Sequence, residues 1–172
     1  MERVHVYLID LLPASSKRLI ACQLMAILLI ALIAGSTFGI WQGYNPTLYS
    51  QDTFLEVHRG AVHGLNTLLP LMGLATMILT LVLTLRTGRH TAVRGLYWTT
   101  LALLVLAGLI TRFGNQPINA MVMTWTADSM PENWVDIRDS WWFWHTIRTL
   151  VSIAALAGLV TATLAARNEH RG

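Results

Sequence analysis

Four long apolar stretches constrain the fold of this chain more than any other feature of its sequence. They run approximately over residues 19–40, 65–85, 96–110 and 147–166, with polar extensions at some ends. A helix needs about 20 mostly apolar residues to cross the ~30 Å hydrocarbon core of a bilayer. The alternating pattern of a membrane barrel is absent from the sequence. We therefore expect an all-α fold: a four-helix transmembrane bundle that forms a single domain over residues 1–172.

The composition agrees with a membrane-embedded chain. Of its 172 residues, 54% are hydrophobic and only 12% are charged, whereas about 25% of a soluble domain is charged. The expected helices span about residues 18–41, 54–86, 92–113 and 131–167. The single cysteine, Cys22, excludes an internal disulfide and a cysteine-based metal motif. The basic residues flank hydrophobic segments instead of clustering, which favours the lipid bilayer as a partner and disfavours nucleic acid.

Charged residues segregate between the two sets of connections. Lysines and arginines precede the first helix, lie between the second and third, and follow the fourth: Arg3, Lys17, Arg18, Arg86, Arg89, Arg94, Arg167 and Arg171. The other two connections carry the acidic residues Asp52, Glu56, Asp128, Glu132, Asp136 and Asp139. The positive-inside rule then predicts an inner (plasma) membrane protein with both termini in the cytoplasm. Most of the unusual polar residues would consequently meet near the outer leaflet.

The connection between the third and fourth helices is too long for a simple turn. Within it, apolar residues recur with helical spacing at Ile118, Met121, Val122 and Trp125, and Pro117 suits a first helical turn. This pattern predicts a short amphipathic helix over about residues 117–127, lying at the membrane interface. Before it, Gly114 suits a helix C-cap.

A polar stripe follows the outer part of the 54–86 helix. At about 100° per residue, Glu56, Arg59 and His63 share one face, together with Asn66. His58 falls away from this face, so we expect His63 to point inward and His58 to touch the headgroup region or a loop. Further along, Pro70 lies within the second apolar stretch. It predicts a kink in the 54–86 helix, which would free a backbone carbonyl near the site.

A second stripe opens the 131–167 helix. Arg138, Trp141, His145 and Arg148 fall on one face, followed by Ser152. A charged side chain inside a membrane helix costs roughly 2.5–3.5 kcal/mol and by default marks a functional site.

Arg148 lies deepest in this stripe and therefore needs a partner. Glu56 is the nearest plausible counter-ion, and Asp139 is the alternative. The sequence leaves open whether Glu56 pairs with Arg148 across the bundle or with Arg59 on its own helix.

Together the two stripes define a predicted site in which each residue type suggests a role. Histidines titrate near neutral pH, arginines hold an anionic or enolate oxygen, and tryptophans suit a flat aromatic ligand. The predicted catalytic residues are His63, His145, Arg148, Arg138 and Glu56. The predicted substrate-binding residues are Arg59, Asn66, Asn115, Asn119, Trp141 and Trp142.

Two cofactor alternatives stay open for the same residues. A transition metal would be bound by His63, His145 and Glu56, through nitrogen and oxygen ligands. Alternatively, haem b would be held between helices by two axial histidines.

The C-terminal third of the chain resembles the anthrone oxygenase-like family. The resemblance rests on the segment Asn115-Gln-Pro-Ile-Asn119, a following Trp-containing stretch, and the run from Trp134 to Thr149, which contains Arg138-Asp-Ser-Trp141 and Arg148-Thr149. The family pattern is Asn-x-Pro-x-Asn, a tryptophan, then Arg-x-x-Trp and a downstream Arg-Thr. It implies a small four-helix membrane protein, in agreement with the layout of the whole chain.

Characterised members of that family oxidise anthrones to anthraquinones with molecular oxygen and without an obvious organic cofactor. By position, the resemblance carries over to Asn115, Asn119, Arg138, Trp141 and Arg148. His145 occupies a position where other members often have a different polar residue, so the resemblance assigns it no role.

Two functions follow from these expectations. The first is a membrane oxidoreductase of the monooxygenase type, in which a lipophilic or aromatic small molecule binds near the outer leaflet beneath the 117–127 helix as a lid. The second is a non-enzymatic haem- or metal-binding or packing subunit of a larger membrane complex, or a homo-oligomer. A Soret band in the purified protein would favour haem, and one bound transition ion would favour a metalloenzyme. Oxygen consumption with a phenolic substrate by a colourless, metal-free protein would favour a cofactor-independent oxygenase.

Overall fold

The computed structural model describes residues 14–88 and 92–169. Arg3, Arg89 and Arg171, which contributed to the predicted orientation, lie outside the described residues. The helices are α2 (Ala14–Gly43), α3 (Gln51–Leu65), α4 (Leu68–Arg86), α5 (Ala92–Leu109), the π-helical turn η2 (Ile110–Asn115), α6 (Gln116–Val122) and α7 (Trp134–Glu169). Two 3-10 turns, η1 (Pro46–Leu48) and η3 (Ala127–Ser129), complete the elements, and the described residues contain no strand.

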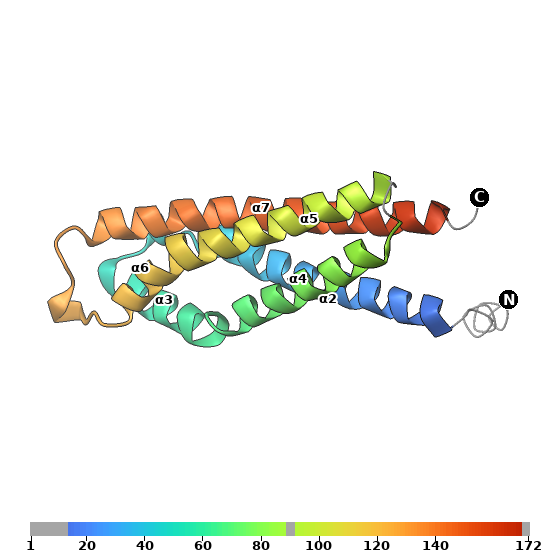
Figure 1. Ribbon diagram of the computed structural model, residues 1–172. Coiled ribbons are helices and arrows are strands. Elements are labelled where there is room, and N and C mark those ends of the chain that lie inside the picture. The colour runs from blue at the N-terminus through green and yellow to red at the C-terminus, as the bar shows by residue number, and fades with distance from the viewer. Residues whose placement is uncertain (1–13, 89–91, 170–172) are drawn as a thin grey trace, which may run out of the picture.

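Four segments are long and apolar enough to cross a membrane: Lys17–Leu48, Gln51–Arg86, Ala92–Val122 and Trp134–Arg167. Their contacts close a ring, because α2 packs on α4, α4 on α5, α5 on α7 and α7 on α2. The predicted all-α fold with four membrane-length helices is confirmed. In Figure 1 the start of α2, the end of α4, the start of α5 and the end of α7 share one end of the elongated bundle, and α3 and α6 lie at the other.

Two buried clusters hold the bundle together. The first lies toward the end shared by the termini and includes Ile30, Tyr97 and Leu159, with the small residues Ala155 and Ala162 fully buried between helices. Small residues let helix backbones approach closely, which is how membrane helices gain packing energy. The second cluster, Phe54, Leu55, Val122 and Trp125, fastens α3 to α6 and to the loop that follows. Several of the polar side chains that were predicted to form the site lie between the two clusters.

The predicted 54–86 helix is two helices in the structure. It begins at Gln51, where Ser50 caps α3, and it is interrupted at Asn66–Thr67. Pro70 explains the position of the break, because a proline lacks an N–H and its ring collides with the carbonyl four residues earlier, here that of Asn66. The predicted disturbance at Pro70 is therefore present, as a break between α3 and α4.

The predicted short helix over about residues 117–127 corresponds to α6, which is shorter than expected. The structure has α6 over Gln116–Val122, and it continues directly from α5 through the π turn η2 as part of one span, Ala92–Val122. Gly114 is not a C-cap, since the described residues contain no glycine with positive φ. It is instead a close-packing position: a Cβ placed there would lie 2.7 Å from Cγ of Trp144.

Candidate functional site

The centre of the site is a hydrogen-bonded chain from Arg148 through His145 to α2. Arg148 Nη2 lies 2.9 Å from His145 Nδ1, and His145 Nε2 lies 3.0 Å from the carbonyl oxygen of Thr37. A guanidinium can only donate and a carbonyl can only accept. His145 must therefore be neutral, with its proton on Nε2. The ring is fully buried (0% exposed), so it fixes the guanidinium of α7 against the backbone of α2.

Arg148 is an internal cation without an acidic partner. Its Nε atom is buried and has no hydrogen-bond partner. Among the described residues no carboxylate forms an ion pair with it, because Asp139 pairs with Arg138 at 2.9 Å and Glu56 is exposed. Of the candidate counter-ions, neither Glu56 nor Asp139 pairs with Arg148 in the described part of the chain, and Glu56 does not pair with Arg59 there either. A half-buried arginine with unused donors is suited to an anionic oxygen supplied from outside the chain.

A stack of rings extends from His145 toward α3. The indole of Trp141 lies nearly parallel to the His145 ring, with centroids 4.9 Å apart. His58 meets the other side of Trp141 edge-on at 4.8 Å, and Phe54 follows at 5.1 Å from His58. His58 is only 5% exposed, and its Nε2 is buried without a hydrogen-bond partner. His58 is therefore a buried histidine that interacts with the side chain of Asn119 and keeps Nε2 free of a hydrogen-bond partner.

Two asparagines fix Trp141 in this stack. The indole N–H donates to Asn119 Oδ1 at 2.8 Å, and Asn119 Nδ2 in turn donates to Asn66 Oδ1 at 2.8 Å. Asn115 Nδ2 donates to the backbone carbonyl of Trp141 at 3.2 Å. Through these hydrogen bonds the three asparagines link the α3–α4 break and the α5–α6 junction to Trp141 of α7. These hydrogen bonds hold Trp141 in place, and Asn66 and Asn119 also line a small cavity, so their part in substrate binding stays a prediction.

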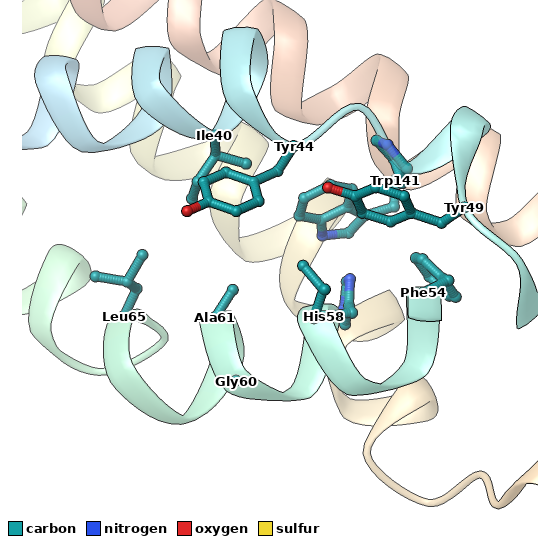
Figure 2. A pocket seen from close by; sticks show the side chains of 11 residues that line it. Ile40, Tyr44, Tyr49, Phe54, His58, Gly60, Ala61, Leu65 and Trp141 are labelled. Carbon is teal, nitrogen blue, oxygen red and sulfur yellow. The ribbon is translucent and has the colours of Figure 1, made fainter. Parts of the chain in front are cut away.

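A cavity of about 310 Å³ opens beside His58 and Trp141. We call it the aromatic cavity. Figure 2 shows Ile40, Tyr44 and Tyr49 on one side of it and Phe54, His58, Ala61 and Leu65 of α3 on the other, with Trp141 between them. Its walls are mostly apolar, so His58 and Trp141 provide much of its polar chemistry.

Two further cavities continue from the aromatic cavity into the bundle. The connecting cavity, about 40 Å³, shares His58 and Trp141 with the aromatic cavity and reaches Asn119 and Arg148. The bundle cavity, about 200 Å³, shares Arg148 with the connecting cavity and extends between all four spans. Arg148 thus borders two of the three cavities.

The structure reverses the predicted roles of the two histidines of α3. His63 and Glu56 are exposed, whereas His58 is buried. The apolar face of α3, with Phe54 and Leu55, turns into the protein, and His58 lies on that face. The prediction that His63 points inward followed from the rule that the polar face of a membrane-buried helix turns toward the protein interior.

The predicted metal trio of His63, His145 and Glu56 does not assemble. Two of its members are exposed, and both ring nitrogens of His145 are already hydrogen-bonded, which leaves no free lone pair for a metal or haem iron. Within the described ranges no group of three or more His, Cys, Asp and Glu residues could hold a metal ion.

The remaining predicted residues lie at the periphery of the site. Arg59 donates to the backbone carbonyls of Trp125 and Met123, so it anchors the loop after α6. Arg138 is 8% exposed, pairs with Asp139 and lies over the Trp134 ring at 5.1 Å. Trp142 stacks on His145 at 5.7 Å.

Sequence reasoning missed His58, Thr37 and the tyrosines of the aromatic cavity. The apolar spacing of Phe54, Leu55, His58 and Ala61 was the one signal that could have placed His58 inside, since residues three and four apart share a helix face. Thr37 contributes only a backbone carbonyl, which no side-chain pattern reveals.

The fold and the site define a small four-helix membrane protein with a buried arginine–histidine–tryptophan cluster next to connected cavities. A model of the anthrone oxygenase family matches residues 59–158, more than half of the chain. This protein therefore belongs to the anthrone oxygenase family, as the sequence motifs predicted. No curated protein and no solved structure matches the chain.

Proposed function

We propose that this protein is a membrane-embedded oxygenase that oxidises an aromatic or lipophilic substrate bound in the aromatic cavity. One observation carries the proposal: the side chains of His58 and Arg148 border the same connecting cavity. His58 Nε2 and Arg148 Nε are both buried without a hydrogen-bond partner, and no carboxylate of the described residues pairs with the half-buried Arg148. A base and an anion-binding group facing one space are what removal of a proton next to a carbonyl requires. Membership of the anthrone oxygenase family supports the oxidative outcome.

The aromatic cavity suits a flat lipophilic molecule. Its ~310 Å³ volume falls at the lower end of the roughly 300–1,000 Å³ typical of ligand pockets. Phe54, Tyr49 and Trp141 supply aromatic surface, and Tyr44 at the border of the cavity is half exposed. The cavity lies beside two helices of membrane length, so a lipophilic substrate would reach it from the bilayer.

The proposed reaction converts a CH₂ group conjugated with a ketone through aromatic rings, as in anthrone, into a carbonyl. His58 removes one proton from the CH₂ carbon, and the resulting enolate oxygen is held by Arg148. The electron-rich carbon reacts with dioxygen to form a C–O bond and a peroxide anion, which His58 reprotonates to a hydroperoxide. Loss of the second C–H proton with cleavage of the O–O bond gives the carbonyl and water. The sum, CH₂ + O₂ → C=O + H₂O, needs no further oxidant or reductant.

In this scheme the other buried residues position the two reacting groups. His145 holds the guanidinium of Arg148 through Nδ1, and the Asn119–Trp141 hydrogen bond fixes the indole wall shared by the aromatic and connecting cavities. The site would face the outer leaflet of the inner membrane with both termini cytoplasmic. The positions of Arg86 and Arg94, at the end of the bundle opposite α3, support this orientation.

A pair of histidine variants tests the proposal. In nanodiscs supplied with anthrone, His58→Gln should lower the rate of oxygen uptake by about 10²–10⁴-fold, the usual contribution of a general base. The matched control, His63→Gln, changes the exposed histidine of the same helix and should leave the rate unchanged. Equal rates for His58→Gln and wild type, with both folded, would refute the assignment of His58 as the base.

A further inference from the structure

The bundle cavity has a wall that is chemically apolar despite the hydroxyl groups in it. It is lined at its inner end by Ile30, Met77 and Leu104. The lining hydroxyls of Thr37, Thr111 and Ser152 all donate to backbone carbonyls of their own helices, at 3.2, 2.9 and 2.8 Å. Their donor capacity is used within the helices. Apart from Arg148, Arg112 and Gln116, the cavity therefore offers water few partners.

We infer that the bundle cavity delivers dioxygen to the site from the hydrocarbon core of the membrane. This inference rests on the proposed function and adds the route of the second substrate. An organic substrate in the aromatic cavity would cover His58 and Trp141, so dioxygen must approach from another side. The bundle cavity meets the connecting cavity at Arg148 and is the other described space that reaches this guanidinium.

The size and lining of the cavity fit a small apolar gas. An apolar cavity of roughly 150 Å³ inside a protein stays dry and takes up xenon or benzene. The bundle cavity measures about 200 Å³, and most of its lining is apolar apart from Arg112, Gln116 and Arg148. It reaches the protein surface beside Leu74, whose side chain is 55% exposed on a membrane-length segment. Dioxygen dissolved among acyl chains would therefore enter without crossing a polar layer.

The position of Arg148 suits the chemistry at the end of this route. When dioxygen takes an electron pair from the substrate carbon and forms the C–O bond, negative charge develops on the outer oxygen. A fixed cation next to that oxygen stabilises the developing charge in a low-dielectric site. Arg148 is held in place there by His145, so its positive charge acts on both the enolate and the oxygen that adds to the ring carbon.

Filling the cavity at a glycine tests the route without touching the site. Gly73 lines the bundle cavity, and a Cβ placed there meets nothing within 4 Å. Gly73→Leu should raise the KM for dioxygen severalfold, with the KM for anthrone and the rate at saturating oxygen unchanged. Gly35→Leu is the control, because Gly35 is exposed, has the same free space and lines none of the three cavities. An unchanged KM for dioxygen in folded Gly73→Leu, or a raised KM for anthrone alone, would overturn the inference.

Xenon binding separates failure of this inference from failure of the proposed function. Wild-type protein in nanodiscs should bind xenon, measured by ¹²⁹Xe NMR, and Gly73→Leu should bind markedly less, whereas Gly35→Leu should match wild type. Absence of oxygen uptake in wild type would refute the oxygenase itself. Equal xenon binding by all three proteins, or a phospholipid acyl chain occupying the cavity in the purified protein, would refute the gas route alone. If Gly73→Leu does not fold, the smaller Gly73→Val replaces it in both measurements.

Discussion

Replacing Arg148 with methionine should lower activity strongly while leaving the stability of the protein nearly unchanged or slightly higher. Methionine keeps an unbranched side chain but removes the charge. Inserting an arginine in the middle of a membrane helix costs about 2.5–3.5 kcal/mol, and Arg148 lies near the middle of the Trp134–Arg167 span without a carboxylate to offset that cost. The substitution relieves this penalty.

The substitution also removes the hydrogen bond from Arg148 to His145 Nδ1. Bonds to charged groups contribute roughly 1.5–3 kcal/mol, so this loss largely offsets the relief. The net change in the free energy of unfolding should lie between about −0.5 and +2 kcal/mol, where a positive value means a more stable variant. Loss of one donor to a developing oxyanion should lower kcat about 10²–10³-fold.

Reversible unfolding in mixed micelles and oxygen uptake with anthrone measure the two effects on the same preparation. Arg148→Lys is the control, since it keeps a positive charge but loses the planar donor geometry; it should retain more activity than the methionine variant. A methionine variant destabilised by more than about 2 kcal/mol would show that Arg148 serves mainly to hold the fold. A variant that retains wild-type turnover would remove Arg148 from the reaction.

Two further substitutions test the packing around the site. Gly114→Ala should destabilise the protein by about 1–3 kcal/mol in a thermal unfolding assay, because the added Cβ would lie 2.7 Å from the Trp144 ring. The control is Gly95→Ala, at an exposed helical glycine with free space around it. In the same assay it should be neutral or should stabilise the protein by up to ~1 kcal/mol. Equal effects at both glycines would contradict the close Gly114–Trp144 packing. Trp141→Phe removes the hydrogen bond to Asn119, so it should lower the free energy of unfolding by about 0.6 and at most ~1.7 kcal/mol. It should also raise the KM for the aromatic substrate. An unchanged KM would argue that the indole does not form the wall of an occupied cavity.

The sequence by itself determined the class of fold and one side of the site. Apolar length fixes four membrane-length helices, because backbone groups in hydrocarbon must be satisfied within each helix. The predicted face of α7 was also right for Trp141, His145 and Ser152, all of which are buried. That argument worked because α7 is a single uninterrupted helix, so spacing in the sequence translates directly into direction in space.

Only the tertiary structure decided how the other side of the site is built. The break at Asn66–Thr67 separates α3 from α4, and packing against Val122 and Trp125 then turns the apolar face of α3 inward, which buries His58 and exposes His63. In the same way, the partner of Arg148 is a histidine of its own helix, and that histidine is held by a backbone carbonyl of α2. Residue spacing orders side chains around one helix, but which face turns inward, and what it meets there, depends on contacts between segments distant in the chain.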